Sequence, residues 1–123
     1  PALQSSFNVF LLPNLYGDII TDEAAQLQGG VGTAGSANIG SKYAMFEAVH
    51  GSAPRMVKEG ISKYASPASL LKASEMMLRH VGYTAHADKL ESLIELANNS
   101  LNMSGDGKGN TAAEFADFIN DRC

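Results

Sequence analysis

Only two runs in this 123-residue chain have the length and the apolar content of buried β-strands. The first is FNVFLL at 7–12, and the second is YAMFEAV at 43–49. Much of the remaining chain shows helical periodicity. Because two strands do not form a stable sheet by themselves, the sequence predicts an α/β chain with an incomplete sheet, whose partner strands would come from residues outside it.

Apolar residues recur at helical spacing in four segments, which we predict to be helices. In the second, Pro67 suits the first helical turn. In the last, Thr111 and Glu114 fit a capping box. The predicted helices span 17–27, 67–81, 85–100 and 111–121. The predicted buried faces contain Leu70, Leu71, Ser74, Met77, Leu78 and Val81 in the second helix, and Leu90, Leu93, Ile94 and Ala97 in the third.

The segment 29–41 is rich in glycine and is predicted to be a loop. It contains the pattern G-x-G-x-x-G at 30–35, which in a dinucleotide-binding Rossmann fold follows a strand and opens a helix. Here the pattern follows a helix and leads into further loop, so a Rossmann fold is not predicted. A tight loop that brings the backbone close to a ligand is the favoured interpretation. Residues 55–66 are predicted to be a mixed surface segment.

Charge and composition exclude several classes of protein. The net charge is −4 and no basic run occurs, so nucleic acid is not an expected partner. No apolar run approaches the roughly 20 residues that a membrane-spanning helix needs. The sole cysteine, Cys123, cannot form an internal disulfide, which fits a reducing compartment. We therefore expect a cytoplasmic protein, or one of the mitochondrial matrix if the source is eukaryotic.

Two aspartates near the start of the first predicted helix form a candidate metal site. Asp18 and Asp22 are four residues apart, so their side chains share one helix face. Two carboxylates can hold Mg²⁺ or Mn²⁺ while water or substrate completes an octahedral shell. From the spacing alone, a solvated acidic helix start is the favoured interpretation, because such pairs are common.

The sequence HGSAP at 50–54 follows the second predicted strand and forms a candidate binding turn. Small residues expose backbone amides that can hold an anion or a nucleotide, and Arg55 adds a cation suited to phosphate. The alternative is an ordinary turn at a strand end, in which His50 is merely hydrogen-bonded and Arg55 lies on the surface. The residues alone leave both interpretations open.

Three stretches carry a resemblance to a known family: NLYGDIITDEAAQLQGGVGTAGSANIG at 14–40, FEAVHGSAP at 46–54 and PASLLKASEMMLRHVGYTAHADKLE at 67–91. In this order they resemble the isocitrate and isopropylmalate dehydrogenases, which are metal-dependent β-decarboxylating dehydrogenases. The stretches SANIG, EAVHG and MMLRHVGY are more similar to isocitrate dehydrogenases. The alternatives are an isopropylmalate, homoisocitrate or tartrate dehydrogenase, or a noncatalytic regulatory subunit of an NAD-linked isocitrate dehydrogenase.

The resemblance implies a function and a fold. A full-length member would oxidatively decarboxylate isocitrate to 2-oxoglutarate in the tricarboxylic acid cycle, with Asp18 and Asp22 binding Mg²⁺ or Mn²⁺. Residues 1–28 would finish a smaller, dimer-forming domain, and 29–123 would form the C-terminal half of a larger cofactor-binding domain. The family's catalytic Tyr and Lys, its substrate arginines and a third metal aspartate precede the matching segment. We therefore expect a homodimer or higher oligomer, and no activity from this chain alone.

The resemblance leaves the choice between NAD and NADP open. Arg55 follows the HGSAP turn, where NADP-preferring members often carry a cation, whereas Asp106 lies in a stretch similar to that of NAD-type enzymes. Ser66 precedes Pro67 where the family usually has Asn-Pro at the adenine contact. The residues expected to bind the cofactor are His50, Gly51, Ser52, Ala53, Pro54, Arg55, Ser66 and Asp106.

Overall fold

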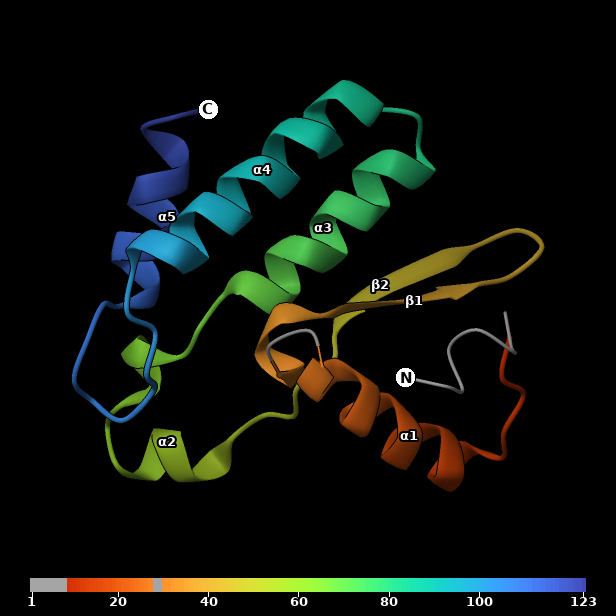
Figure 1. Cartoon of the computed structure of the whole chain (residues 1–123), viewed down its shortest axis with the longest axis horizontal. Helices are drawn as coiled ribbons and strands as arrows, with labels where there is room; N and C mark the ends of the chain where they lie inside the picture. Colours follow the sequence, from red (N-terminus) through yellow and green to blue (C-terminus); the bar gives the residue numbers. More distant parts are fainter. Residues whose placement is uncertain (1–8, 28–29) are drawn as a thin grey trace.

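The computed structural model describes residues 9–27 and 30–123 and contains a β-hairpin with helices around it (Figure 1). Helix α3 packs against both strands and against α4, and α4 in turn packs against α5. In Figure 1 the hairpin lies between α3 and α1. The elements in chain order are α1 (Asn14–Leu27), η1 (Val31–Thr33), β1 (Gly35–Ile39), β2 (Ala44–Ala48), α2 (Pro54–Lys58), η2 (Ser62–Tyr64), α3 (Ala68–His80), α4 (Thr84–Ser100) and α5 (Ala112–Asn120).

The two strands pair antiparallel, with a register that runs from Gly35 opposite Ala48 to Ile39 opposite Ala44. Strand β2 confirms the prediction at 43–49. The prediction that 29–41 is entirely loop was wrong, because β1 lies within it. The glycine content of this segment predicted a loop, but Gly35 is needed in the strand because it packs against α3. A Cβ on that residue would lie 2.6 Å from the backbone nitrogen of Ala73, so only glycine lets β1 approach α3 this closely.

The strand predicted at 7–12 is not observed where the structure can test it. Residues 9–12 form no strand, and Phe7 and Asn8 lie outside the described residues. Val9 and Leu11 are highly exposed, and among the described residues no strand pairs with this segment. A strand is held by hydrogen bonds to a neighbour, so apolar content alone did not create one here. The α/β class is confirmed, with a two-stranded sheet in the described part.

The helical core lies between α3, α4 and α5. Phe115 is fully buried at its centre, and Leu71 and Leu90 pack against its margin. The prediction for α4 is confirmed, because three of its four predicted residues are buried and the fourth is half-buried. The capping box of α5 is also confirmed, since Thr111 Oγ1 accepts from the Glu114 backbone and Glu114 accepts from the Thr111 backbone. The buried cluster comprises Ala68, Leu93, Ile94, Ala97, Phe115 and Ile119.

The predicted buried face of α3 was largely wrong. Leu70 is 56% exposed and Met77 is 43% exposed, although Leu71 does pack on the core. Helix α3 is sandwiched between the hairpin and α4, and where the hairpin approaches closely the buried residues are the small Ser69 and Ala73. The buried residues of this helix are Ala68, Ser69, Ala73 and Glu75.

An ion-pair network fixes α3 against α4. The buried Glu75 accepts from Nε of Arg79 at 2.8 Å, while Nη1 of Arg79 reaches Asp88 at 2.8 Å and Nη2 reaches Glu91 at 3.2 Å. Lys72 bonds Glu91 as well. This hydrogen bond from Lys72 holds the pKa of Glu91 below its ordinary value. The network therefore links the two helices through several charged groups.

Segment 55–66, predicted to be a mixed surface segment, contains the short helix α2 and the 3₁₀ turn η2. Most of its side chains are exposed or half-buried. Within the described ranges, no helix combines the length and the apolar content required to cross a membrane.

Candidate functional site

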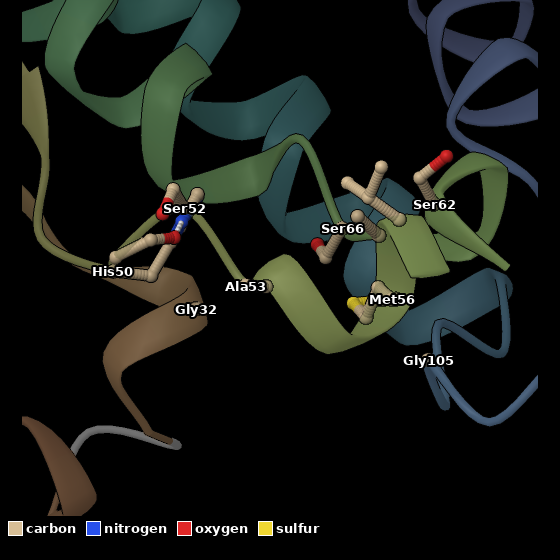
Figure 2. Close-up of a pocket in the computed structure, with 11 residues that line it drawn as sticks. Gly32, His50, Ser52, Ala53, Met56, Ser62, Ser66 and Gly105 are labelled. Atoms are coloured by element: carbon tan, nitrogen blue, oxygen red, sulfur yellow. Dashed lines mark hydrogen bonds between the residues drawn. The ribbon is translucent and has the colours of Figure 1, made fainter. Parts of the chain in front are cut away.

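A cavity of about 580 Å³ opens between the turn after β2, the helix α2 and two loops from other parts of the chain (Figure 2). Its walls come from η1, from the β2–α2 turn, from α2 and η2, and from the loop before α5. The lining residues are Gly32, His50, Gly51, Ser52, Ala53, Met56, Val57, Ser62, Ala65, Ser66 and Gly105. We call this space the turn cavity.

Backbone strain shapes the turn after β2. Ala53 has φ 44° and ψ 58°, and it is the one non-glycine residue of the described chain with positive φ. An alanine in this left-handed region costs about 1–2 kcal/mol, and such strain is concentrated at binding and catalytic sites. Pro54 then begins α2, and the Met56 backbone N–H donates to the Ala53 carbonyl at 3.0 Å. The strained residue therefore turns the chain sharply from the hairpin into α2, along the cavity wall.

Two loop residues complete the opposite side of the turn cavity. Ser66 Oγ accepts a hydrogen bond from the Ala68 backbone N–H at 3.3 Å, which places its hydroxyl at the start of α3. Gly105 contributes backbone with φ 69°. The cavity surface is thus mostly apolar with a few hydroxyls and backbone groups, as in many sites for small organic ligands.

Three of the eight residues predicted to bind a cofactor do not line this cavity. Pro54 and Arg55 belong to α2 but are not among its lining residues, and the Arg55 side chain is 80% exposed and lies 3.6 Å from Glu59. Asp106 adjoins Gly105, but its carboxylate accepts from Ser104 Oγ and from the Lys108 backbone N–H. These hydrogen bonds lower the pKa of Asp106. The carboxylate is therefore engaged within its own loop.

Several lining residues of the turn cavity could not be predicted from the sequence. Met56, Val57 and Ser62 carry no motif that marks them, because they reach the cavity only through the turn at Ala53. Gly32 carried a signal, since the glycine-rich loop was expected to approach a ligand. The five predicted residues that the structure does bring together are His50, Gly51, Ser52, Ala53 and Ser66.

A second cavity, of about 520 Å³, holds both aspartates predicted to bind a metal. It lies between α1 and the end of the hairpin, and we call it the aspartate cavity. Asp18 and Asp22 line it from α1, and Glu47 lines it from β2, where it accepts from Asn38 Nδ2 at 3.1 Å. The full lining comprises Asp18, Thr21, Asp22, Ser36, Glu47, Ala48, Val49 and His50. His50 therefore borders both cavities.

The aspartate cavity fits a divalent cation as a partial site. Asp18 and Asp22 offer oxygen ligands from one helix face, which suits Mg²⁺ or Mn²⁺ and leaves most of the coordination shell for water or a substrate. No cluster of three or more His, Cys, Asp or Glu side chains that could enclose a metal occurs in the described part of the chain. Asp18 and Asp22 would therefore supply only part of the coordination shell of such an ion.

Comparison with known proteins gives consistent matches. The chain matches the isocitrate/isopropylmalate dehydrogenase family over residues 2–121. It is 55% identical over 86 residues to isocitrate dehydrogenase [NADP] of Rickettsia typhi, covering 70% of this chain and 17% of that protein. It is 45% identical over 118 residues to isocitrate dehydrogenase [NAD] subunit 2, mitochondrial, of Kluyveromyces lactis, covering 93% and 31%.

A solved structure is also similar. The crystal structure of isocitrate dehydrogenase from Methylococcus capsulatus matches with a TM-score of 0.73 and 39% identity, over 89% of this chain and 32% of that one. The chain thus spans between 17% and 32% of the length of these three relatives.

Proposed function

Because the chain belongs to the isocitrate/isopropylmalate dehydrogenase family, we propose that it supplies the metal-binding and cofactor-binding part of an isocitrate dehydrogenase. The whole enzyme would oxidise isocitrate with NAD or NADP and release CO₂ to give 2-oxoglutarate. The observation that carries this proposal is the position of His50, which lines the turn cavity and the aspartate cavity together. A hydride transfer requires the nicotinamide and the metal-held substrate to be neighbours. The cofactor is therefore proposed to extend from the turn cavity past His50, so that its nicotinamide end reaches the aspartate cavity.

Asp18 and Asp22 are proposed to bind Mg²⁺ or Mn²⁺. Both lie on α1 and line one cavity, so their carboxylates can approach one ion from the same side. When bound, the cation supplies Lewis-acid stabilisation of the oxygen charge that develops as a 2-hydroxy acid is oxidised and decarboxylated. The rest of the coordination shell would come from substrate, water and residues of the whole enzyme.

The turn cavity is proposed to hold the adenosine end of the cofactor. Its walls offer apolar contacts from Met56 and Val57 and hydroxyls from Ser52 and Ser66. A flat base packs on apolar side chains, while ribose hydroxyls need a few placed polar partners. The backbone next to the strained Ala53 approaches this space. The turn cavity would therefore hold the adenosine through an apolar wall and a small number of hydrogen bonds.

The proposal includes both NAD and NADP as the cofactor. Arg55 would favour the 2′-phosphate of NADP, but its neighbour Glu59 offsets its charge, and Arg55 is not among the lining residues of the turn cavity. Asp106 is proposed as a cofactor-binding residue that favours NAD, because it lies in a stretch similar to that of NAD-type enzymes. The named relatives include both an NADP and an NAD enzyme.

We also propose the domain division and the assembly that the family implies. Residues 1–28 would end the smaller, dimer-forming domain and 29–123 would belong to the larger one. The substrate would be a small 2-hydroxy acid, and the active enzyme a homodimer or higher oligomer. We propose the cytoplasm as its location, or the mitochondrial matrix in a eukaryote.

The proposed function is tested in the intact enzyme with substitutions on α1. Asp18→Asn and Asp22→Asn are expected to lower metal-dependent turnover with isocitrate by about 10²-fold or more, because each removes an anionic ligand. Glu23→Gln is the matched control, since Glu23 lies on the same helix but does not line the cavity. Unchanged turnover in both aspartate variants would overturn the proposal.

A further inference from the structure

The buried hydroxyl of Ser69 bridges the two segments that flank the open end of the hairpin. It lies on α3 with an exposed fraction of 0%. Its Oγ donates to the carbonyl oxygen of Ala34 at 2.5 Å and accepts from the backbone N–H of Val49 at 3.1 Å. One residue of α3 thus bonds to the segment just before β1 and to the segment just after β2.

The strand register shows what this hydroxyl replaces. Gly40 donates to the Tyr43 carbonyl at 2.9 Å, so 40 and 43 form a hydrogen-bonded pair. Such pairs recur at every second position of an antiparallel ladder, which with the observed register gives 38 with 45 and 36 with 47. The next pair would be Ala34 with Val49, in which the Val49 N–H donates directly to the Ala34 carbonyl. The Ser69 hydroxyl stands between these two groups and relays the bond.

We call the Ser69 hydroxyl between Ala34 and Val49 the wedge. It lies where the two segments that flank the hairpin separate to form part of the turn cavity. Beyond Ala34 the chain leads back to Gly32, and beyond Val49 it leads to His50, and both of these residues line the cavity. Gly35 holds β1 against the backbone of α3 at this end, which keeps Ser69 within reach. Direct pairing of Ala34 with Val49 would bring the Gly32 and His50 segments closer together.

We propose that Ser69 is a positioning residue that sets the width of the turn cavity for the nicotinamide cofactor. The identity of the ligand rests on the proposed function. The bridge that Ser69 makes between Ala34 and Val49 does not depend on it. Ser69 does not line the cavity, so its effect passes through the backbone at Ala34 and Val49. Removing the hydroxyl lets the ladder close or leaves both groups without their present partner.

The test uses three variants of the intact enzyme. Ser69→Ala removes the relay, and Ser69→Cys keeps a weaker donor and acceptor of similar shape in case the alanine variant does not fold. Ser74→Ala is the matched control, because Ser74 lies on the same helix and its hydroxyl bonds only the Leu70 carbonyl of its own helix. The readouts are KM for the cofactor, kcat at saturation, and hydrogen exchange of the Val49 amide.

We expect Ser69→Ala to raise KM for the cofactor about tenfold with kcat within about twofold, the cysteine variant to lie between it and wild type, and Ser74→Ala to change neither. Val49 exchange should change in the Ser69 variants alone. A lowered melting temperature with unchanged KM would overturn the positioning role, and unchanged Val49 exchange would overturn the wedge. If wild type bound no nicotinamide cofactor, the proposed function would fail, while the exchange readout would still decide the wedge.

Discussion

The two halves of the described structure differ in how they are held together. The α3–α4–α5 region has a core around Phe115 and an ion-pair network between two helices. Helix α1 buries only Ala25, and Ile19 is 52% exposed. Yet α1 and the hairpin end carry both predicted metal ligands and His50. The candidate metal site is therefore placed at the edge of the well-packed region, away from the α3–α4–α5 core (Figure 1).

The largest expected effect lies in the packed region. Phe115→Ala should lower the free energy of unfolding by about 3–5 kcal/mol, because it leaves a cavity among fully buried groups. Ile19→Ala on the exposed α1 should cost under about 1 kcal/mol. Urea unfolding followed by circular dichroism measures both. Equal losses from the two substitutions would break the distinction between the regions.

A smaller effect is expected where the hairpin meets α3. Gly35→Ala should cost about 1–3 kcal/mol, because the added Cβ would lie 2.6 Å from the Ala73 nitrogen and the strand must move. Gly32→Ala is the control for stability, since no atom lies within 4 Å of its Cβ position. A neutral Gly35→Ala variant would show that α3 and β1 are not held in close contact.

The ion pairs of α3 and α4 predict a pH effect of at most about 1 kcal/mol, because the groups are partly exposed. The pKa of Glu91 is lowered in the folded chain by the hydrogen bond from Lys72. Its contribution is therefore present above its unfolded value and is lost as pH falls below about 4.5. Glu91→Gln should flatten the stability profile there, whereas Glu95→Gln, on the exposed side of α4, should not. Indistinguishable profiles would rule out a role for the network.

The smallest effect concerns the choice of cofactor. Arg55→Asp in the intact enzyme should move the kcat/KM ratio from NADP towards NAD by less than about tenfold, because Arg55 is highly exposed and paired with Glu59. Arg122→Asp serves as a control for net charge, since that residue follows the C-terminal end of α5 and does not line the turn cavity. A ratio that moves equally in both variants would show that Arg55 does not read the phosphate.

Local patterns predicted the parts of the fold that depend on local physics. The spacing of apolar residues identified α4, and Thr111 with Glu114 identified the start of α5. Strand β1 was missed because glycine normally weakens strands, and only the contact with Ala73 explains Gly35. The face of α3 was misassigned for the same reason, since the hairpin it packs against was not yet known.

In the candidate site, too, local motifs could be predicted from the sequence and contacts between distant segments could not. The motifs located His50 to Ala53 and the two aspartates of α1, but the sequence could not show that the two groups meet at His50. That relation depends on contacts between segments far apart in the chain. Ser69 was assigned to no role, because a serine in a helix gives no local signal that it bridges two distant backbone groups.

The central claim is that the metal and the cofactor bind in adjoining cavities, and Mn²⁺ relaxation tests it most directly. In the intact enzyme, Mn²⁺ should strongly broaden the nicotinamide proton resonances of bound cofactor. Asp18→Asn with Asp22→Asn should abolish the broadening while cofactor binding persists, because His50 and the turn cavity remain. Broadening that is absent in wild type, or that survives in the double variant, would contradict the account.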